Sequence, residues 1–399
     1  MHCRRNCFDR RAPASSRKPI ISIFLSAENP LSQTTVSKPD VRELKSLAVK
    51  GLSPMLDEQK QLFCYRLIRT ETGFAREGLS PRYTIMTLLG LQEFERDGEH
   101  SPFDMQALYR SITKDTSWIP GIGDLGLTIW LIAAFEPEGL EEFFRRTSLE
   151  TALDRYADAR QGRTTELAWF LAGLAHAALA CPATIPNLTD LAVEAYHRLK
   201  ENQGEYGFFG HMSATKSVPG FLRGRIGNFA DQIYPIYSMA KFATAFSVEE
   251  PLGSALECAS AICGAQGPLG QWWWLYDSRS GETSSRYPVY SVHQQGMAPM
   301  GLFALEEATG QNFQDAIYRG LAWIYGPNEL GADMRDFSHN LIWRCILPKN
   351  RQSKYWDTIL SLVRPPNLDA PVGPLEILYE DRPYELGWLL YAFRKTDES

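Results

Sequence analysis

The chain has 399 residues, of which 44% are hydrophobic and 22% are charged, so it can bury a large core as one large domain or two ordinary ones. The formal net charge of −6 gives no overall attraction to nucleic acid or to an anionic membrane surface, and neither is expected as a partner. Seven cysteines, an odd number without a CxxC pair, favour a reduced cytoplasmic compartment, and no metal or cofactor is predicted.

The first forty residues differ in composition from the rest. They begin with a basic stretch, and the apolar run from Ile20 to Ala27 is far too short to span a membrane. We interpret residues 1–40 as a disordered basic tail, with a weak signal peptide as the alternative. Residues 41–399 are predicted to form a single domain.

Some segments have the pattern of half-exposed helices. In residues 190–200, Leu191, Ala195 and Leu199 share one face, while Glu194 and Arg198 lie on the other. Residues 355–363 repeat this pattern. We expect both segments in an outer layer.

A second kind of segment alternates with these, apolar on nearly every face but polar at its N-terminal end. A helix that is apolar all round must be surrounded by other helices. The segments are residues 80–91, 123–134, 164–177, 229–243, 290–305, 337–347 and 383–393. They recur about every 40 to 50 residues, with two longer intervals, which is typical of a helical-hairpin repeat.

A closed ring suits these two helix types better than an open solenoid, in which both layers would be amphipathic. The sequence therefore predicts an all-α fold, an α/α toroid of six or seven helical hairpins. Closure would gather the polar starts of the inner helices around one end of a central cavity. The long loops 204–228 and 267–289 are expected at that same end.

Two turns share one motif. Gln266 to Trp272 fits Q-x3-G-x-W, and Gln203 to Phe209 fits it with phenylalanine in place of tryptophan. The motif resembles the QW repeat of the terpenoid cyclase and prenyltransferase α/α-toroid superfamily. The resemblance implies that each glutamine caps an outer helix and that the aromatic ring stacks beneath it.

The resemblance extends to architecture and carries over no catalytic residue. The acidic D-x-D-D motif of squalene–hopene cyclase-like enzymes is absent, as is the zinc-binding set of the protein prenyltransferases. The wider class of α/α toroids also includes glycoside hydrolases, polysaccharide lyases and epimerases. The site must therefore indicate the function.

Three residues at the starts of inner segments are the predicted catalytic groups: Glu166, Asp231 and His293. The carboxylates could serve as an acid and a base, although a carboxylate at a helix start can also simply cap the helix. His293 has Gln294 and nearby tyrosines as hydrogen-bond partners for either ring nitrogen.

Other polar and aromatic residues near the inner segments and in the two long loops are candidates for substrate binding. The aromatic rings could stack on a sugar, and arginines beside helix starts could bind a carboxylate or phosphate. The candidates are Asp124, Arg223, Arg225, Trp273, Trp274, Tyr276, Arg286, Tyr287, Tyr290, Gln294, His339 and Glu385.

These residues favour a carbohydrate-active enzyme, a hydrolase, lyase or epimerase acting on a small or oligomeric saccharide that could be anionic. One alternative is a terpenoid-cyclase-like enzyme in which the aromatic rings stabilise carbocations. The other is a non-catalytic toroid that serves as a scaffold or binding protein. The sequence does not indicate an oligomeric state.

Overall fold

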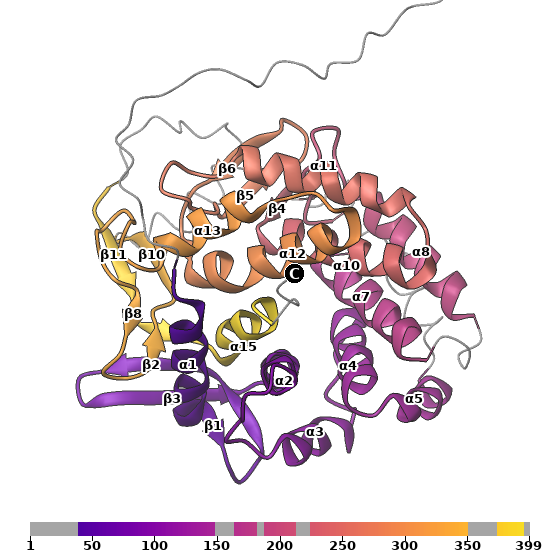
Figure 1. Ribbon diagram of the computed structural model, residues 1–399, viewed down its shortest axis with the longest axis horizontal. Coiled ribbons are helices and arrows are strands. Elements are labelled where there is room, and N and C mark those ends of the chain that lie inside the picture. Colours follow the sequence, from indigo (N-terminus) through magenta and orange to yellow (C-terminus); the bar gives the residue numbers. More distant parts are fainter. Residues whose placement is uncertain (1–38, 148–162, 182–186, 213–223, 350–372, 395–399) are drawn as a thin grey trace, which may run out of the picture. The chain divides into compact units, whose positions relative to one another are not determined.

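The computed structural model describes residues 39–147, 163–181, 187–212, 224–349 and 373–394. All of them follow Ser37 and belong to one compact unit, in which helices dominate (Figure 1). The predicted basic tail, residues 1–40, lies outside the described residues except for its last two positions. Asp40 caps the first helix by accepting a hydrogen bond from the backbone of Arg42 at 2.9 Å.

Six inner helices form a closed ring within the described residues. Each one packs against the next, and the last returns to the first (Figure 1). They are α2 (Pro81–Arg96), α4 (Ile122–Phe135), α7 (Thr164–Ala180), α10 (Ala230–Phe246), α12 (Ala298–Thr309) and α15 (Pro383–Ala392). The predicted α/α toroid is confirmed, with six inner helices in the part of the chain that the structure describes.

An outer layer of helices surrounds this ring. In α8 the predicted face of Leu191, Ala195 and Leu199 is buried, as expected for an outer helix. The outer helices are α1 (Val41–Leu52), α3 (Met105–Thr113), α5 (Leu140–Arg146), α8 (Leu188–Lys200), α11 (Glu250–Gly264) and α13 (Gln314–Trp323). Short 3-10 turns, η1 (Ser53–Met55) and η2 (Pro137–Gly139), follow α1 and α4. The outer helix predicted at residues 355–363 lies outside the described residues.

The inner helices are buried on all faces, as their composition predicts. In α4 every residue from Ile122 to Ala133 is buried. Glycines let neighbouring inner helices approach closely: a Cβ on Gly90 would lie 2.0 Å from the carbonyl oxygen of Gly387. The apolar positions expected in the core are confirmed as buried: Leu127, Trp130, Leu167, Leu171, Leu174, Ile236, Leu302, Leu305, Ile342, Leu386 and Leu389.

Short antiparallel strands, which the sequence did not indicate, connect the helices. A four-stranded sheet has the order β1-β2-β12 with β3 also on β2, and the other sheets are β11-β10-β7, β4-β5-β6 and β8-β9. The strands are β1 (Leu56–Asp57), β2 (Leu62–Thr70), β3 (Gly73–Leu79), β4 (Ile226–Asn228), β5 (Leu275–Asp277), β6 (Glu282–Ser285), β7 (Val289–Tyr290), β8 (Arg335–Asp336), β9 (Leu341–Ile342), β10 (Cys345–Pro348), β11 (Leu375–Leu378) and β12 (Glu380–Asp381).

The segment 337–347 is not the inner helix that was predicted. It contains β9 and the start of β10, and Asn340 adopts a positive φ of 57° in the turn before them. Residues 341–347 are nevertheless all buried. A buried run of this length that is apolar except for Arg344 fits a strand as well as a helix, which explains the error.

The inner segment predicted at residues 290–305 is helical but contains a π-helix near its start. This π-helix, η3 (His293–Met297), runs directly into α12. Single π turns occur frequently at functional sites. Here the π turn carries His293 and Gln294, two of the predicted site residues.

The two QW-like turns have the same geometry. The side-chain amide of Gln203 donates to the carbonyl of Gly207 in its own turn and to that of Ser254 on the next outer helix. The amide of Gln266 donates in the same way to the carbonyls of Gly270 and Ala316. All four bonds are 2.9–3.1 Å long. Phe209 and Trp272 are fully buried. Each turn therefore ties one outer helix to the next.

A second repeated contact joins these turns to the inner ring. The backbone N–H of Phe209 donates to the side chain of Gln232 on α10 at 2.7 Å, and the N–H of Trp272 donates to Gln294 at 3.3 Å. Both glutamines are fully buried. The repeat therefore extends from the outer helix through the turn to the start of the following inner helix.

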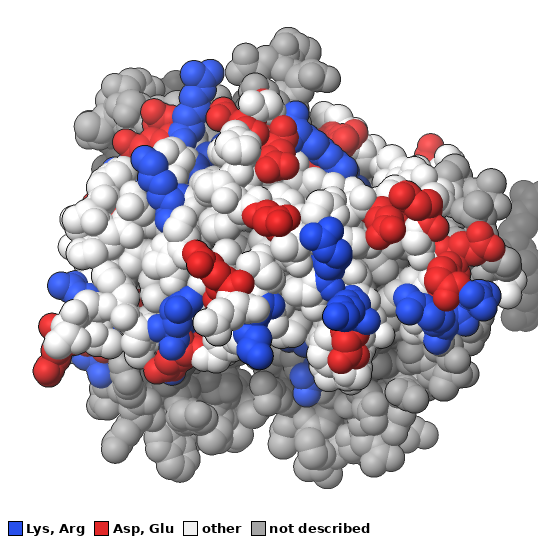
Figure 2. Space-filling view, turned by 90° about the horizontal axis from the view of Figure 1, so that it is seen from below, with Lys and Arg blue, Asp and Glu red and all other residues white. Residues whose placement is uncertain are grey.

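The described surface carries both signs of charge. On the side shown in Figure 2, basic and acidic side chains of the described residues are interspersed among uncharged ones. No helix among the described residues is long and apolar enough to cross a lipid bilayer.

Candidate active site

A pocket of about 290 Å³ lies where the N-terminal ends of inner helices converge. Residues from the starts of α2, α7, α10 and α15 and from η3 line it, together with residues from the connecting segments. The lining residues are Arg82, Tyr83, Met86, Arg163, Thr165, Glu166, Trp169, His211, Asn228, Ala230, Tyr234, Trp274, Tyr290, His293, Met297, Arg344 and Tyr384. Among the predicted site residues, Glu166, Trp274, Tyr290 and His293 are part of this lining.

Glu166 supplies a partly exposed carboxylate to the pocket. It lies in the first turn of α7, and its side chain is 21% exposed. Arg163 is its ion-pair partner, with 3.7 Å between Nη1 and Oε1. A carboxylate that is held this loosely can both contact a ligand and exchange a proton.

His211 and Asp231 form a hydrogen-bonded pair beside Glu166. His211 Nδ1 lies 3.0 Å from Asp231 Oδ2, and His211 lines the pocket while Asp231 is fully buried. Asp231 also accepts hydrogen bonds from the hydroxyl of Thr165 at 2.7 Å and the N–H of Asn228 at 3.0 Å. An aspartate held in this way fixes the ring of the histidine and assigns the Nδ1 proton to the hydrogen bond, which leaves Nε2 as the basic nitrogen.

Asp124 lies behind the pocket wall and holds Arg82. Its two oxygens accept from Nε and Nη2 of Arg82, both at 2.6 Å, which is the bidentate geometry that suits arginine. This ion pair raises the pKa of Arg82. The Arg82 guanidinium also lies over the ring of Trp169, 5.3 Å from its centroid. Asp124 is therefore a partner of a pocket residue and does not itself line the pocket.

Glu385 plays a similar part for Arg344. The Arg344 guanidinium pairs with Glu385 through Nη1 and lies 3.5 Å from Glu380 through Nε. Burial raises the pKa of Glu385, although Arg344 and Arg382 oppose the shift. Arg344 is itself buried and lies over the ring of Tyr290 at 5.0 Å. The pair places a buried cation in the wall of the pocket.

His293 lies in an aromatic cage at the edge of the pocket. Its ring lies 4.5 Å from Phe229, 5.1 Å from Tyr290 and 6.1 Å from Trp274, centroid to centroid. Burial lowers its pKa to about 3, and the charge of Arg344 contributes in the same direction. His293 is therefore neutral near pH 7, and its buried Nδ1 has no hydrogen-bond partner among the described residues.

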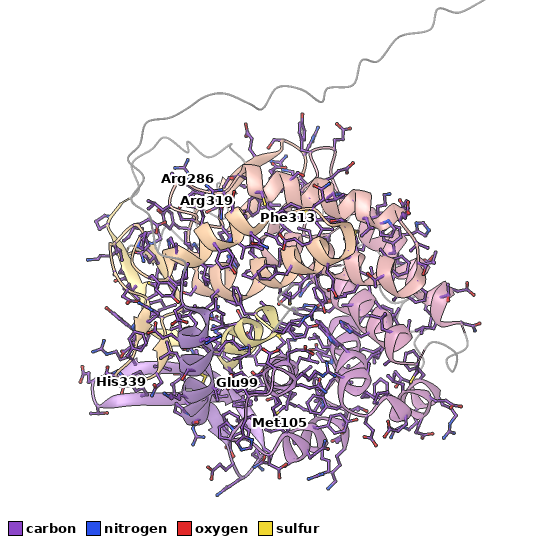
Figure 3. The ribbon with its side chains drawn as sticks, viewed as in Figure 1. Glu99, Met105, Arg286, Phe313, Arg319 and His339 are labelled. Carbon is purple, nitrogen blue, oxygen red and sulfur yellow. The ribbon has the colours of Figure 1, made fainter. Side chains whose placement is uncertain are left out.

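Several predicted binding residues of the loop 267–289 lie outside the pocket lining. Tyr276 is buried against Phe208, with ring centroids 4.9 Å apart. Trp273 lies beneath the guanidinium of Arg286, and the hydroxyl of Tyr287 donates to Glu329 at 3.3 Å. Figure 3 shows Arg286 at the periphery of the fold. These side chains pack the loop and do not face the pocket.

The other predicted binding residues also have partners elsewhere. Gln294 connects Trp272 to the inner ring, as described above. Arg225 pairs with Asp277 across β4 and β5, with 3.2 Å between Nε and Oδ2. His339 pairs with Asp336 at 2.9 Å and lies at the periphery near the β2–β3 hairpin (Figure 3). Arg223 lies outside the described residues.

The sequence reasoning missed Arg82, Arg163, His211 and Arg344. The signal for His211 was present: it follows Phe209 by two positions, just as Trp274 follows Trp272, and both line the pocket. Arg82 stands next to Tyr83 at the start of an inner segment. Arg163 directly precedes another such start. Arg344 lies in the segment wrongly predicted as a helix, so its place in the pocket wall could not be predicted.

Metal ligands are not gathered in this part of the structure. Within the described ranges, no three side chains of the His, Cys, Asp or Glu types are placed to share a metal ion. The pocket lining offers the imidazoles of His211 and His293, the carboxylate of Glu166, tyrosine hydroxyls and arginine guanidinium groups.

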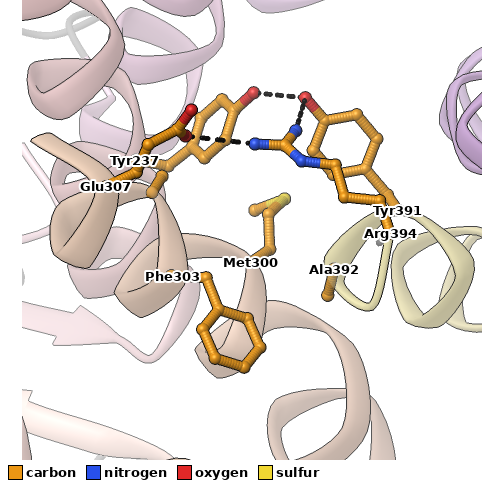
Figure 4. Close-up of a pocket in the computed structure, with 8 residues that line it drawn as sticks. Tyr237, Met300, Phe303, Glu307, Tyr391, Ala392 and Arg394 are labelled. Atoms are coloured by element: carbon orange, nitrogen blue, oxygen red, sulfur yellow. Dashed lines mark hydrogen bonds and ion pairs between the residues drawn. The ribbon is translucent and has the colours of Figure 1, made fainter. Parts of the chain in front are cut away.

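A second, smaller cavity lies at the opposite, C-terminal ends of α12 and α15. It has about 20 Å³ of space, room for about one water molecule. Arg394 bonds to Glu307 at 3.2 Å and lies 3.5 Å from the hydroxyl of Tyr391, which bonds to Tyr237 at 2.6 Å (Figure 4). This cavity is too small for a sugar.

Stacked aromatic rings fill the ring of helices between the two cavities. Trp130 lies 4.5 Å from His176, 5.1 Å from Tyr237 and 5.7 Å from Trp388, and its edge meets Tyr391 at 5.4 Å. We call Trp130, His176, Tyr237, Trp388 and Tyr391 the aromatic plug. Trp388 donates to the hydroxyl of Tyr234, which lines the pocket, so the plug lies directly behind this part of the pocket wall.

No protein-family model and no curated sequence matches the chain. Solved structures resemble it along most of its length. They include a possible GH105 family member from Salmonella enterica (TM-score 0.57, 11% identity, covering 91% of this chain and 94% of that one) and an unsaturated glucuronyl hydrolase from Bacillus sp. GL1 (0.55, 13%, 88% and 94%). Cellobiose 2-epimerase from Bacillus thermoamylovorans also matches (0.52, 12%, 88% and 98%). At these identities the resemblance shows the fold, the α/α toroid.

Proposed function

We propose that this protein is a carbohydrate-active enzyme that transfers protons on a saccharide bearing a carboxylate. The observation that carries the proposal is the pairing of His211 with Asp231 in a pocket that also contains Glu166, Arg82 and Arg344. The structural relatives support it, because their names describe enzymes that act on sugars. Neither the family nor the reaction follows from that resemblance alone.

The catalytic roles follow from the environment of each group. His211 is the general base, because its Nε2 is left free to accept a proton. Asp231 is fully buried and acts through His211 as a positioning residue. Glu166 is the partly exposed acid that returns a proton, and His293, neutral and in the pocket wall, is a hydrogen-bond acceptor for a sugar hydroxyl.

The arginines suit a carboxylated sugar. A guanidinium has five N–H donors, and the contacts of Arg82 and Arg344 with their acidic partners use only some of them. The remaining donors can hold a uronate carboxylate and stabilise the negative charge that it gains when the adjacent C–H bond is broken. The rings of Trp169, Trp274 and Tyr290 offer apolar surface for the sugar face.

Elimination or epimerisation fits this pocket better than hydrolysis by two carboxylates. Two-carboxylate hydrolysis needs an acid and a second carboxylate that both reach the scissile bond. Among the described residues, Glu166 is the carboxylate that lines the pocket, whereas Asp124 and Asp231 are buried with their own partners. Proton removal by His211 needs no second carboxylate.

The alternatives are less well supported. A carbocation would be quenched by the carboxylate, imidazole and phenol groups of this pocket, which argues against terpenoid-cyclase-like chemistry. A scaffold has no need for a histidine that lines a cavity and is held there by a buried aspartate. The cytoplasmic location remains a prediction from cysteine usage.

Solvent exchange tests the proposal. The protein would be incubated in D2O with glucuronate- and galacturonate-containing oligosaccharides, and deuterium next to the carboxylate would be followed by NMR together with the ultraviolet absorbance of unsaturated products. We expect exchange or elimination with the wild type. His211→Gln should lower turnover by about 10²- to 10⁴-fold, because it removes the base.

His339→Gln is the matched control, since His339 forms the same kind of aspartate pair outside the pocket. It should retain full turnover. Full activity of folded His211→Gln would refute the assigned role. Release of reducing ends without exchange or elimination would favour hydrolysis instead.

A further inference from the structure

We infer a second sugar-binding subsite outside the pocket, formed by Tyr65 on β2 together with the guanidinium of Arg382. The inference rests on the proposed function and narrows its substrate class to oligosaccharides. It begins with the size of the pocket. At about 290 Å³ the pocket is at the lower limit of ligand sites, which usually have roughly 300–1,000 Å³, so a longer saccharide must extend beyond it.

A row of three tyrosine rings leads out of the pocket. Tyr384 and Tyr83 line the pocket, with ring centroids 4.5 Å apart. Tyr65 stacks on Tyr83 at 5.4 Å with an interplanar angle of 14°, and it does not line the pocket. Exposure rises along the row, because Tyr83 and Tyr384 are half-buried and Tyr65 is 42% exposed. The row therefore continues the aromatic wall of the pocket into solvent.

Arg382 fixes the outer end of this row. Its Nη1 donates to the hydroxyl of Tyr65 at 3.0 Å and to that of Tyr83 at 3.1 Å, and its guanidinium carbon lies 4.4 Å from the Tyr65 ring centroid. Glu380 holds Arg382 through Nε at 2.6 Å. An exposed tyrosine that is held in one orientation loses little conformational entropy when a sugar stacks on it.

Tyr65 does not contribute its ring to the hydrophobic core. Its neighbours on β2, Phe63 and Leu67, are buried, whereas the ring of Tyr65 stays at the surface. β12 pairs with β2 beside it, which places Arg382, the residue after β12, next to the ring. An amphipathic ring beside a cation presents both an apolar face and hydrogen-bond donors, the combination that a sugar uronate uses.

The test is a titration by calorimetry with the monomer, the linear dimer and the linear tetramer of glucuronic acid. It is carried out in the His211→Gln background, so that no sugar is converted. We expect the dimer to bind more tightly than the monomer. Tyr65→Ala should weaken dimer binding by roughly tenfold, the size of one aromatic contact, and leave monomer binding nearly unchanged.

Two further variants separate stacking from other causes. Tyr65→Phe keeps the ring and should retain most of the preference for the dimer. Tyr206→Ala removes another exposed tyrosine, 57% exposed and outside the row, and should have no effect on any of the sugars.

Equal affinities of the monomer and the dimer in the parent protein would overturn the subsite and leave the proposed function intact. An equal loss for both sugars in Tyr65→Ala would also overturn it, because the ring would then act on the pocket. If none of the three glucuronates binds, the subsite for this sugar is overturned, and the proposed function is decided by the exchange experiment with the galacturonate-containing sugars.

Discussion

Buried titratable side chains make the strongest residue-scale prediction, and His293 is the best example. Burial lowers its pKa from 6.5 to about 3, so the folded protein keeps it neutral while the unfolded chain takes up a proton below about pH 6.5. Between these two values the unfolded state binds more protons, and stability falls as the pH falls. His176 shifts in the same direction, also because of burial.

His293→Gln should therefore flatten the pH dependence of the free energy of unfolding. The slope between about pH 6 and pH 4 should decrease by up to about 1.4 kcal/mol per pH unit, the contribution of one proton. Urea denaturation at several pH values measures it. Gln294→Leu, which changes the same buried segment without a titrating group, should lower stability but keep the slope. An unchanged slope in His293→Gln would contradict the assigned neutral state.

Three buried carboxylates hold pocket residues in place and do not line the pocket themselves. The sequence indicated Asp124, Asp231 and Glu385 as site residues, and each lies behind the wall, bonded to Arg82, His211 or Arg344. Helix-start position could be read from the pattern of apolar residues. A carboxylate at a helix start can either point into the cavity or pair with a basic side chain. Which of the two occurs depends on residues that are distant in the sequence, so the pattern of apolar residues could not predict it.

At the scale of elements, each glutamine turn joins one outer helix to the next. Gly270 has a φ of +88°, and a Cβ there would lie 2.1 Å from the carbonyl oxygen of Arg319. Gly270→Ala should therefore lower the free energy of unfolding by about 1–3 kcal/mol. Chemical denaturation provides the measurement.

Gly253 is the matched control, because it lies inside α11 with open space around it. Gly253→Ala should raise stability by about 0.5–1 kcal/mol, since alanine favours a helix. If Gly270→Ala were as stable as Gly253→Ala, the turn would not depend on its left-handed glycine.

Six of the seven predicted inner segments are helices, and the reason for the one failure is physical. Residues 337–347 are as long as residues 383–393 and also carry polar side chains near their start, so the two segments look alike in the sequence. The remaining run, residues 341–347, is apolar except for Arg344 and fits either a strand or a helix. The repeat also relates two of the predicted catalytic residues. Asp231 and His293 each directly precede a glutamine that binds a turn, so the two occupy equivalent positions in successive repeats.

At the scale of the whole described unit, closure of the ring couples distant parts of the chain. α15 packs on α2, and β12 pairs with β2, so residues near 380–390 complete a layer begun near residue 60. Gly90→Ala would place a methyl group against the backbone of Gly387. We expect a loss of about 1–3 kcal/mol from this overpacking.

Because closure is shared by all inner helices, far-ultraviolet circular dichroism and tryptophan fluorescence should show this loss in one common transition. Gly264→Ala, at the open end of α11, should leave the transition where it is or raise it. Separate transitions for the two probes would mean that the ring opens at α15 before the rest unfolds.

The aromatic plug also limits how a polymer can be processed. Trp130, Tyr237, Trp388 and Tyr391 are all buried and packed against one another across the middle of the ring, so a sugar chain cannot pass through it. If the pocket takes a sugar chain, both substrate and product would have to enter and leave on the pocket side of the plug. Passage of a polymer through the centre of the ring is blocked by these side chains.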